Sequence, residues 1–273
     1  MHQPSKTRLT PTEIAPETFL IHDHQGEGTA PVVVDLNALV IRAAEPVVVD
    51  TGVAGNREQY LADVFGLVEP ADVRWVFISH DDVDHTGNVN ALMDACPNAT
   101  LVVNWFITQR MEGTLAVPPA RQRWIDDGGT LDVGDRTLLA LRPPIYDAPT
   151  TRGLFDPMTG VFWSSDSFAT PLLTPARTVD DLDEEFWTDG MHMFGQYISP
   201  WVTMVEDAKF QATVDRIAAL QPTVVAGCHT PAVNGDRVAR ALATTRTTPT
   251  AVVPPEPDQA VLEQIQRSLT IAA

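Results

Sequence analysis

The chain has 273 residues, 44% of them hydrophobic, so it can bury the core of one large α/β domain or of two small ones. It carries 36 Asp and Glu against 18 Lys and Arg, and the formal charge of -18 argues against nucleic acid or an anionic membrane surface as a partner. Its two cysteines, Cys96 and Cys228, form no CxxC pair, which excludes a disulfide framework and a thiolate-rich zinc site. We see no signal peptide and no apolar stretch of membrane-spanning length, so we expect a soluble cytoplasmic protein.

The first half of the chain alternates short apolar runs with segments of helical period, which predicts an α/β fold. The expected strands are rich in β-branched residues and cover residues 32–34, 38–42, 47–50, 73–79 and 101–103. The expected helices cover residues 57–65, 88–95 and 105–111.

The second half keeps this alternation after two hairpin-like segments, which are punctuated by glycines and end at Leu141. We expect a strand at residues 161–163, an acidic loop or helix start at 180–185, and mostly helical structure at 194–220 with a break at Pro200. The last predicted strand covers residues 223–226, and a helix follows at 236–244.

These elements predict one domain over residues 1–244, a Thr- and Pro-rich linker over 245–258 and a C-terminal amphipathic helix over 259–273. The apolar stripe of that helix consists of Val261, Leu262, Ile265 and Leu269. Such a stripe is expected to dock on the domain or on a second copy of the chain, which leaves a homodimer open.

The strongest predicted strands end in acidic residues or histidine, namely Asp50, His80, Asp166 and His229. In layered α/β proteins, ligands collect where the carboxyl ends of strands meet the following loops. We therefore expect these four side chains to converge.

The densest group of possible metal ligands is the hexapeptide His80-Asp81-Asp82-Val83-Asp84-His85. In an extended chain His80, Asp82 and Asp84 would share one face, and His85 can join them if the chain turns there. Two imidazoles and two carboxylates exceed what one small ion needs and suit two adjacent ions. The alternative is a solvated acidic turn, but spare charges directly after an apolar strand would be costly.

These residues resemble the metallo-β-lactamase superfamily, whose signature is HxHxDH after a buried strand. Asp50-Thr51-Gly52 is similar to an earlier turn of that superfamily, Asp166 to its bridging aspartate, and Gly227-Cys228-His229 to the segment of its last ligand histidine. The resemblance implies an α/β fold with four layers, the αββα metallo-β-lactamase-like sandwich.

Asp82 departs from the general signature and resembles the flavodiiron branch, which carries HxExDH. That branch has a further histidine before the bridging aspartate, and here no histidine lies between His85 and Asp166. By spacing, Asp147 is the best substitute, although a surface turn is its alternative and Asp156 lies nearby.

The resemblance implies two ligand sets joined by a bridge. His80, Asp82 and Asp147 would hold one ion, Asp84, His85 and His229 the other, and Asp166 would lie between the ions. The four carboxylates balance two divalent ions. This donor set favours iron, with manganese or zinc as alternatives.

Several neighbours of these residues have expected roles of their own. We expect Asp50 to hold a ligand histidine or a backbone turn, and Asp81 to point into solvent. His22 and His24 lie in a polar loop and are expected at the surface. We expect Cys228 to be a small packed residue and not a nucleophile, because no base is evident nearby.

Three residues are candidates for catalysis. Asp84 could orient a bridging hydroxide. The resemblance places His192 and Tyr197 on a helix that lines the pocket, where they could contact substrate or supply protons; core packing is the alternative.

Two functions follow from this interpretation. The first is a non-haem di-iron site that binds or reduces dioxygen, nitric oxide or peroxide. Flavodiiron enzymes carry a flavodoxin-like domain with FMN, and this chain ends too soon after His229 to contain one. We therefore expect no flavin on this chain and electrons from a separate partner protein.

The second function is hydrolysis of an ester, thioester, lactone or phosphoester by a metal-bridging hydroxide. Carboxylate-rich ligation lowers the Lewis acidity of the ions, which counts against it. A degenerate site that serves as an interaction domain is the third possibility.

Overall fold

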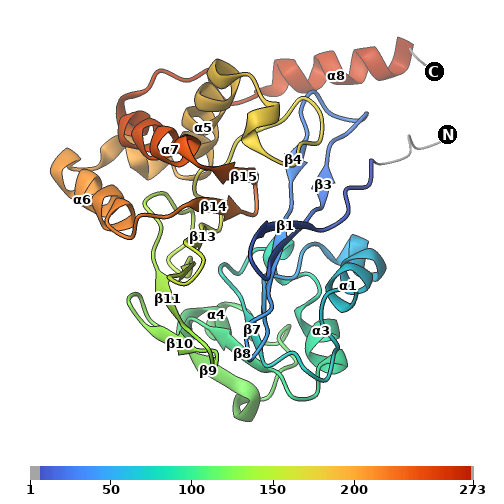
Figure 1. Cartoon of the computed structure of the whole chain (residues 1–273). Coiled ribbons are helices and arrows are strands. Elements are labelled where there is room, and N and C mark those ends of the chain that lie inside the picture. Colours follow the sequence, from blue (N-terminus) through green and yellow to red (C-terminus); the bar gives the residue numbers. More distant parts are fainter. Residues whose placement is uncertain (1–6, 272–273) are drawn as a thin grey trace.

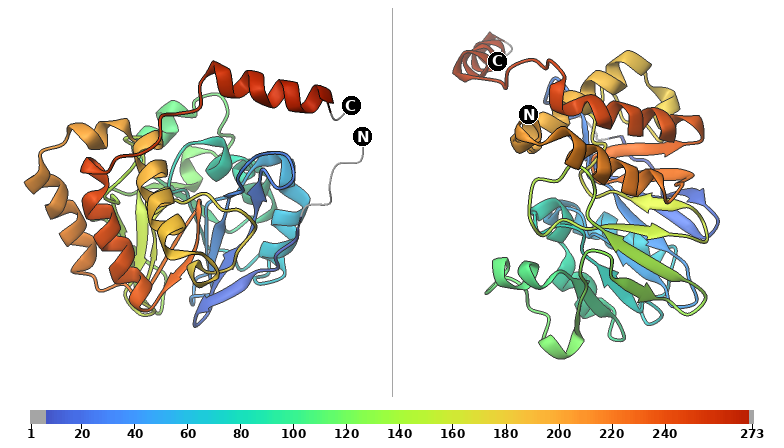
Figure 2. Two further views of the ribbon diagram at one scale, coloured as in Figure 1. Left: turned by 90° about the horizontal axis from the view of Figure 1, so that it is seen from above. Right: turned by 90° about the vertical axis from the view of Figure 1, so that its left-hand side faces the viewer.

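Two β-sheets pack face to face, and helices cover the outer face of each sheet (Figures 1 and 2). The structure is a computed structural model that describes residues 7–271, and side chains are described up to residue 267. The predicted four-layer αββα sandwich of the metallo-β-lactamase type is confirmed.

The first sheet has seven strands in the order β1-β2-β5-β6-β7-β8-β9. They are β1 (Thr12–Ala15), β2 (Thr18–Ile21), β5 (Ala38–Ile41), β6 (Val47–Val49), β7 (Trp75–Phe77), β8 (Thr100–Val103) and β9 (Gln122–Trp124). Strands β6 to β9 run parallel, so their carboxyl ends lie at one edge.

The second sheet has six strands in the order β10-β11-β12-β13-β14-β15. They are β10 (Thr130–Asp132), β11 (Thr137–Leu141), β12 (Gly153–Asp156), β13 (Val161–Trp163), β14 (Val224–Gly227) and β15 (Thr230–Asn234). Only β13 and β14 run parallel here. A small ladder pairs β3 (His24–Gln25) with β4 (Val34–Asp35).

The described part of the chain contains eight α-helices. They are α1 (Arg57–Phe65), α2 (Val83–Thr86), α3 (Val89–Ala95), α4 (Trp105–Arg110), α5 (Glu184–Ile198), α6 (Asp207–Ala218), α7 (Asp236–Thr247) and α8 (Gln259–Ile271). Helices α1, α3 and α4 pack on the first sheet, and α5 and α7 pack on the second. No helix in the described part of the chain is both long and apolar enough to span a bilayer.

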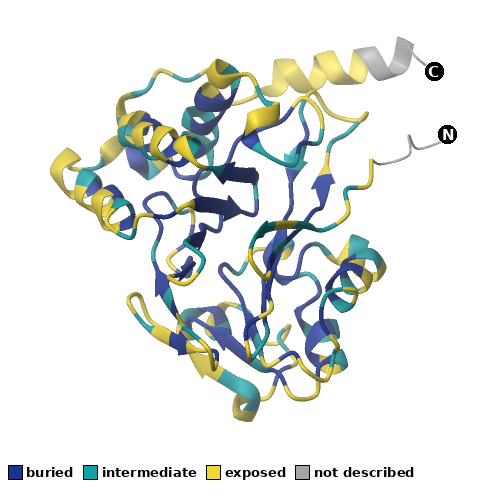
Figure 3. Cartoon of the chain, viewed as in Figure 1, coloured by how far each residue is buried: buried dark blue, intermediate teal, exposed yellow. Residues whose placement is uncertain are grey.

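The central strands are apolar on both faces because each sheet is covered twice. One core cluster lies between the sheets and joins Leu39, Phe77 and Trp163. Other clusters lie under the helices, and Figure 3 shows the central strands in the colour of buried residues. Because these strands are buried on both faces, their sequences are uninterrupted apolar runs.

Some predicted boundaries were wrong. Residues 223–226 are not the last strand, because β15 follows and pairs with β14. Helix α7 continues to Thr247, into the predicted linker, since Thr244 and Thr245 are buried against the domain. Helix α5 begins ten residues before the predicted helical stretch at 194, where the Asp183 carboxylate caps it by accepting from Phe186 N.

Helix α8 stands away from the sandwich (Figures 2 and 3). Its apolar residues Val261, Leu262 and Ile265 are 40–46% exposed. The Leu269 side chain is not among those that the structure describes. Residues 1–6 and 272–273 lie outside the described part of the chain. The division into domain, linker and helix stays a prediction.

Candidate metal centre

Parallel strands of both sheets deliver polar side chains to one edge of the sandwich. Asp50 follows β6 directly, His80 comes three residues after β7, Asp166 three residues after β13, and His229 two residues after β14. The side chains predicted to converge at the strand ends therefore meet, because the carboxyl ends of these strands face each other across the two sheets.

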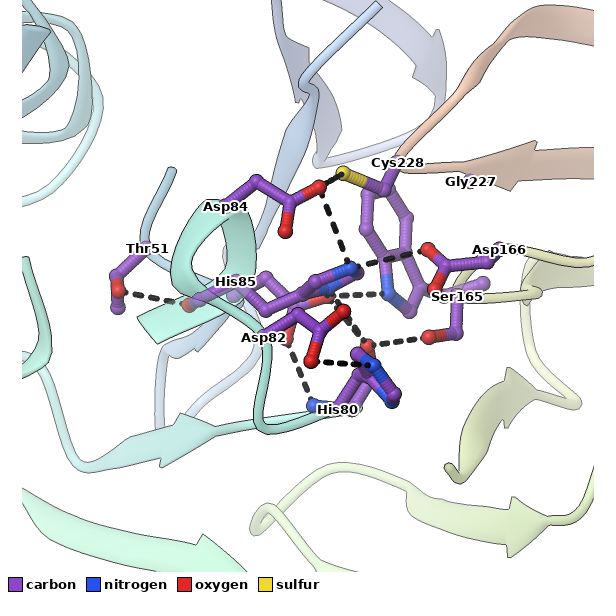
Figure 4. A network of polar contacts seen from close by, with 12 residues as sticks. Thr51, His80, Asp82, Asp84, His85, Ser165, Asp166, Gly227 and Cys228 are labelled. Carbon is purple, nitrogen blue, oxygen red and sulfur yellow. Dashed lines mark hydrogen bonds and ion pairs between the residues drawn. The ribbon is translucent and has the colours of Figure 1, made fainter. Parts of the chain in front are cut away.

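The chain does not run extended through the hexapeptide as predicted. Asp82 has extended backbone and precedes α2, a single helical turn that contains Asp84 and His85. His80 and Asp82 therefore face one part of the site, and Asp84 and His85 face another (Figure 4).

A close approach of two backbones holds this turn. Thr51 donates from N and Oγ1 to the backbone oxygen of His85, at 2.7 and 2.8 Å. A Cβ atom on Gly87 would lie 2.4 Å from the backbone nitrogen of Ala54, so only glycine fits there. The Asp50-Thr51-Gly52 segment thus holds α2 in position.

Seven side chains form what we call the cluster: His80, Asp82, Asp84, His85, Asp147, Asp166 and His229. In its first sub-site, His80 Nε2 lies 3.3 Å from Asp82 Oδ1 and 3.5 Å from Asp147 Oδ1. Asp147 comes from the loop between β11 and β12, so the substitute inferred from spacing lies beside His80.

In the second sub-site, Asp84 Oδ2 lies 3.3 Å from His229 Nε2 and 3.8 Å from His85 Nε2. Asp166 Oδ1 lies 3.0 Å from His85 Nε2 and 3.4 Å from His229 Nε2. It also groups with His80 and Asp147 within 4.8 Å, so Asp166 stands between the two sub-sites, in the position expected of a bridge.

Each imidazole is oriented by a partner behind it. His80 Nδ1 lies 3.0 Å from Thr151 Oγ1, His85 Nδ1 lies 2.9 Å from Asp50 Oδ2, and His229 Nδ1 lies 2.7 Å from the backbone oxygen of Asp35. Such contacts fix the ring and leave Nε2 free to bind a cation. Asp50 thus holds a cluster histidine, as its predicted role required.

The pKa values of the cluster side chains depend on the charges of their neighbours. Burial alone would lower the pKa of His85, but Asp166, Cys228 and Asp50 outweigh it and hold that pKa well above its usual value. Burial would raise the pKa of Asp166, yet His85 and His229 hold it well below its usual value. Burial and the negative charge of Asp166 raise the pKa of Asp147. A divalent cation would replace these protons and relieve the carboxylate repulsion.

Buried atoms without hydrogen bonds show whether metal ions fit here. His80 Nε2, His85 Nε2 and Asp166 Oδ1 are buried and make no hydrogen bond of good geometry; their polar neighbours are other side chains of the cluster, at 3.0 Å or more. Unpaired polar atoms are costly in a protein interior unless something binds them. Three imidazoles and four carboxylates in two adjoining sets therefore fit two divalent ions.

The two remaining catalytic candidates face other parts of the molecule. His192 Nε2 lies 3.1 Å from the backbone oxygen of Thr244 and 3.0 Å from Thr247 Oγ1. The Tyr197 hydroxyl lies 3.0 Å from the backbone oxygens of Pro254 and Pro255. Both side chains thus tie α5 to the C-terminal part of the chain, and the structure does not bring these polar groups into the cluster.

Other side chains near the motif also have structural partners. The Asp81 side chain is only 5% exposed, since Arg110 and Thr150 donate to its carboxylate, so the expected solvent position was wrong. Asp156, the neighbour of Asp147 in the sequence, pairs with Arg136 and accepts from Met158 N.

Sequence reasoning missed residues outside the motifs that contact side chains of the cluster. Asp35 supplies a backbone oxygen to His229, and burial raises the pKa of its own carboxyl to about 7. The Phe194 ring centroid lies 5.5 Å from that of His229. A backbone acceptor carries no sequence signal, and neither Thr151 nor Phe194 lies in a motif.

The predicted surface positions of His22 and His24 were also wrong. Both are buried. His22 Nε2 lies 2.9 Å from Thr12 Oγ1, and His24 Nε2 lies 3.0 Å from Glu27 Oε2.

The buried His22 should make the protein sensitive to acid. Burial, with Arg177 and His24 nearby, lowers its pKa to about 4, while an unfolded histidine has a value near 6.5. Between these values the unfolded chain binds the extra proton, so stability falls as the pH falls, by up to about 3 kcal/mol in total. Urea unfolding of the wild type and of His22→Gln at several pH values would measure this. If the two curves of stability against pH ran parallel, the assignment to His22 would be wrong.

The four-layer sandwich, with its polar cluster at the carboxyl ends of the strands, defines a protein of the metallo-β-lactamase fold class. Residues 34–230 match the profile of the ODP family beta lactamases, and the chain belongs to that family.

Its relatives include flavodiiron proteins. A putative diflavin flavoprotein A 2 of Nostoc sp. is 29% identical over 133 residues, which are 48% of this chain and 23% of that protein. The rubredoxin oxygen:oxidoreductase of Desulfovibrio gigas has a TM-score of 0.75 at 18% identity, over 87% of this chain and 61% of that one. The flavodiiron protein of Giardia intestinalis has a TM-score of 0.74 at 17% identity, over 90% and 60%. The chain therefore spans less than two thirds of each of these proteins, and the family expected from the motifs is confirmed.

Proposed function

We propose that this chain is a di-iron protein that binds and reduces dioxygen or nitric oxide with electrons from a separate donor protein. The observation that carries the proposal is the cluster itself: two adjoining sets of imidazole and carboxylate ligands around Asp166, with three buried atoms that lack a hydrogen bond. Iron bound there would pass electrons from the donor to a diatomic gas and would offer it open coordination positions.

The donor set favours redox chemistry over hydrolysis. Asp82 and Asp147 make the first sub-site rich in oxygen ligands, and this lowers the Lewis acidity on which a hydrolytic hydroxide depends. A relative of known structure is named an oxygen:oxidoreductase and another a flavodiiron protein, which supports the same direction.

The exposure of the ligands suggests the side from which a small molecule enters. The Asp82 side chain is 56% exposed, against 22% for Asp147 in the same sub-site and 18% for Asp84 and 12% for His229 in the second. The Phe194 ring stands beside His229 in the second sub-site. We infer that a gas ligand approaches along the first sub-site, while Phe194 shields the second from water.

The test is anaerobic reconstitution with ferrous iron, followed by metal counting and by gas consumption with a chemical reductant. We expect two irons per chain and reductant-dependent loss of dissolved dioxygen or nitric oxide. Asp215→Ala, a change at an exposed ion pair, serves as the control and should behave as the wild type. Stoichiometric zinc with turnover of a panel of esters and thioesters, and no gas consumption by the iron form, would reject the proposal in favour of a hydrolase.

A further inference from the structure

The second sub-site contains a sulfur atom. Cys228 is fully buried, and its backbone is held on both sides: N donates to the backbone oxygen of Ser165 at 2.9 Å, and O accepts from the backbone nitrogen of Asn37 at 2.9 Å. Its Sγ lies 3.7 Å from Asp84 Oδ2, and Figure 4 shows the sulfur pointing toward that carboxylate. The backbone therefore presents the thiol to the site.

This sulfur shares its space with the other ligand atoms. Potential ligand atoms of Asp84, His85, Cys228 and His229 all lie within 4.8 Å of one another. A separate observation is that His85 Nε2 is buried and makes no hydrogen bond of good geometry, although Asp166 Oδ1 lies 3.0 Å and Asp84 Oδ2 3.8 Å from it. Two imidazoles, a carboxylate and a thiol thus surround one point, with Asp166 beside them, and donors of these kinds bind zinc in proteins.

We propose that Cys228 is a further protein ligand of the ion in the second sub-site, beside Asp84, His85, His229 and the bridging Asp166, and that it binds as the thiolate after its proton has passed to the solvent. This inference rests on the proposed metal centre. It makes the two sub-sites chemically unequal: the first offers one imidazole and two carboxylates, and the second adds sulfur. Thiolate favours zinc over the hard cations that prefer oxygen ligands, so a limiting amount of zinc should fill the second sub-site first.

The experiment uses the whole chain, freed of metal by a chelator, kept reduced, and loaded with one equivalent of zinc. X-ray absorption at the zinc edge should show one sulfur neighbour at about 2.3 Å. Cys228→Ser should lose that neighbour and bind the first zinc about tenfold more weakly or worse. Cys96→Ser is the matched control, since Cys96 is the other buried cysteine and packs under α3, away from the cluster; it should keep the sulfur neighbour.

The possible failures are distinguishable. Bound zinc with only nitrogen and oxygen neighbours in the wild type would overturn the role of Cys228 and leave the metal centre intact. A sulfur neighbour that persists in Cys228→Ser would also overturn it. A wild-type chain that binds no zinc, iron or manganese would instead reject the proposed function. The wild-type spectrum decides the question even if Cys228→Ser fails to fold, and a sulfur signal that is lost in Cys96→Ser would contradict the assignment.

Discussion

Replacing Asp166 with alanine is expected to remove both metal ions from the protein. Asp166 Oδ1 lies 3.0 Å from His85 Nε2 and 3.4 Å from His229 Nε2, and it also groups with the ligands of the first sub-site. Without the carboxylate, both sub-sites lose the donor that they share, and the charge that offsets two cations falls by one. Metal analysis after reconstitution should give close to zero ions per chain, against two for the wild type.

Asp147→Ala is the matched control, because Asp147 lies beside His80 and is part of the first sub-site only. This variant should keep one ion. Two ions retained by Asp166→Ala would show that this residue does not bridge the sub-sites, and unchanged metal content in Asp147→Ala would remove Asp147 from the ligand set.

Replacing Asp50 with alanine should lower the free energy of unfolding more than a substitution of any exposed residue does. The Asp50 carboxylate is fully buried and accepts hydrogen bonds from Ser79 N at 2.7 Å, from Ser79 Oγ, from His85 Nδ1 at 2.9 Å and from Trp163 Nε1 at 3.0 Å. The variant leaves these donors without an acceptor, and we expect a loss of about 3–5 kcal/mol in the free energy of unfolding.

The same variant should weaken metal binding about 10- to 100-fold, because His85 loses the group that orients it. Urea unfolding measures the first effect and metal titration the second. Asp215→Ala removes an exposed pair with Arg246 and should cost less than about 1 kcal/mol. A loss in Asp50→Ala that is no larger than in this control would refute the structural role assigned to Asp50.

Sequence patterns located the cluster because several of its side chains follow buried strands. An apolar strand that ends in a charged residue carries information, since the charge must meet a partner where the strand stops. His80, Asp166 and His229 could be found in this way. Asp147 could be inferred only from spacing and resemblance, because its loop is placed by tertiary contacts, including the bond from Trp201 Nε1 to the backbone oxygen of Tyr146 at 2.8 Å.

The errors have physical causes as well. A period of two and a single helical turn cannot be told apart over six residues, so the turn at Asp82 was predicted as extended chain. His22 lies in a polar stretch, yet it is buried, and local sequence does not record its contact with Thr12, ten positions earlier. The side on which a helix presents a residue such as His192 depends on packing against α7, which local sequence does not record.

The cluster is assembled from both sheets. Asp84 and His85 follow a strand of the first sheet, while Asp166, Cys228 and His229 follow strands of the second, and Cys228 is separated from Asp84 by 144 positions in the chain. An ion held by these residues would therefore act as a covalent cross-link does: it would close a loop of more than half the chain and restrict the unfolded state. Closing a loop of this length is worth on the order of 5 kcal/mol in the chain-entropy estimate. The side chains that would bind the ion would thus also stabilise the association of the two sheets.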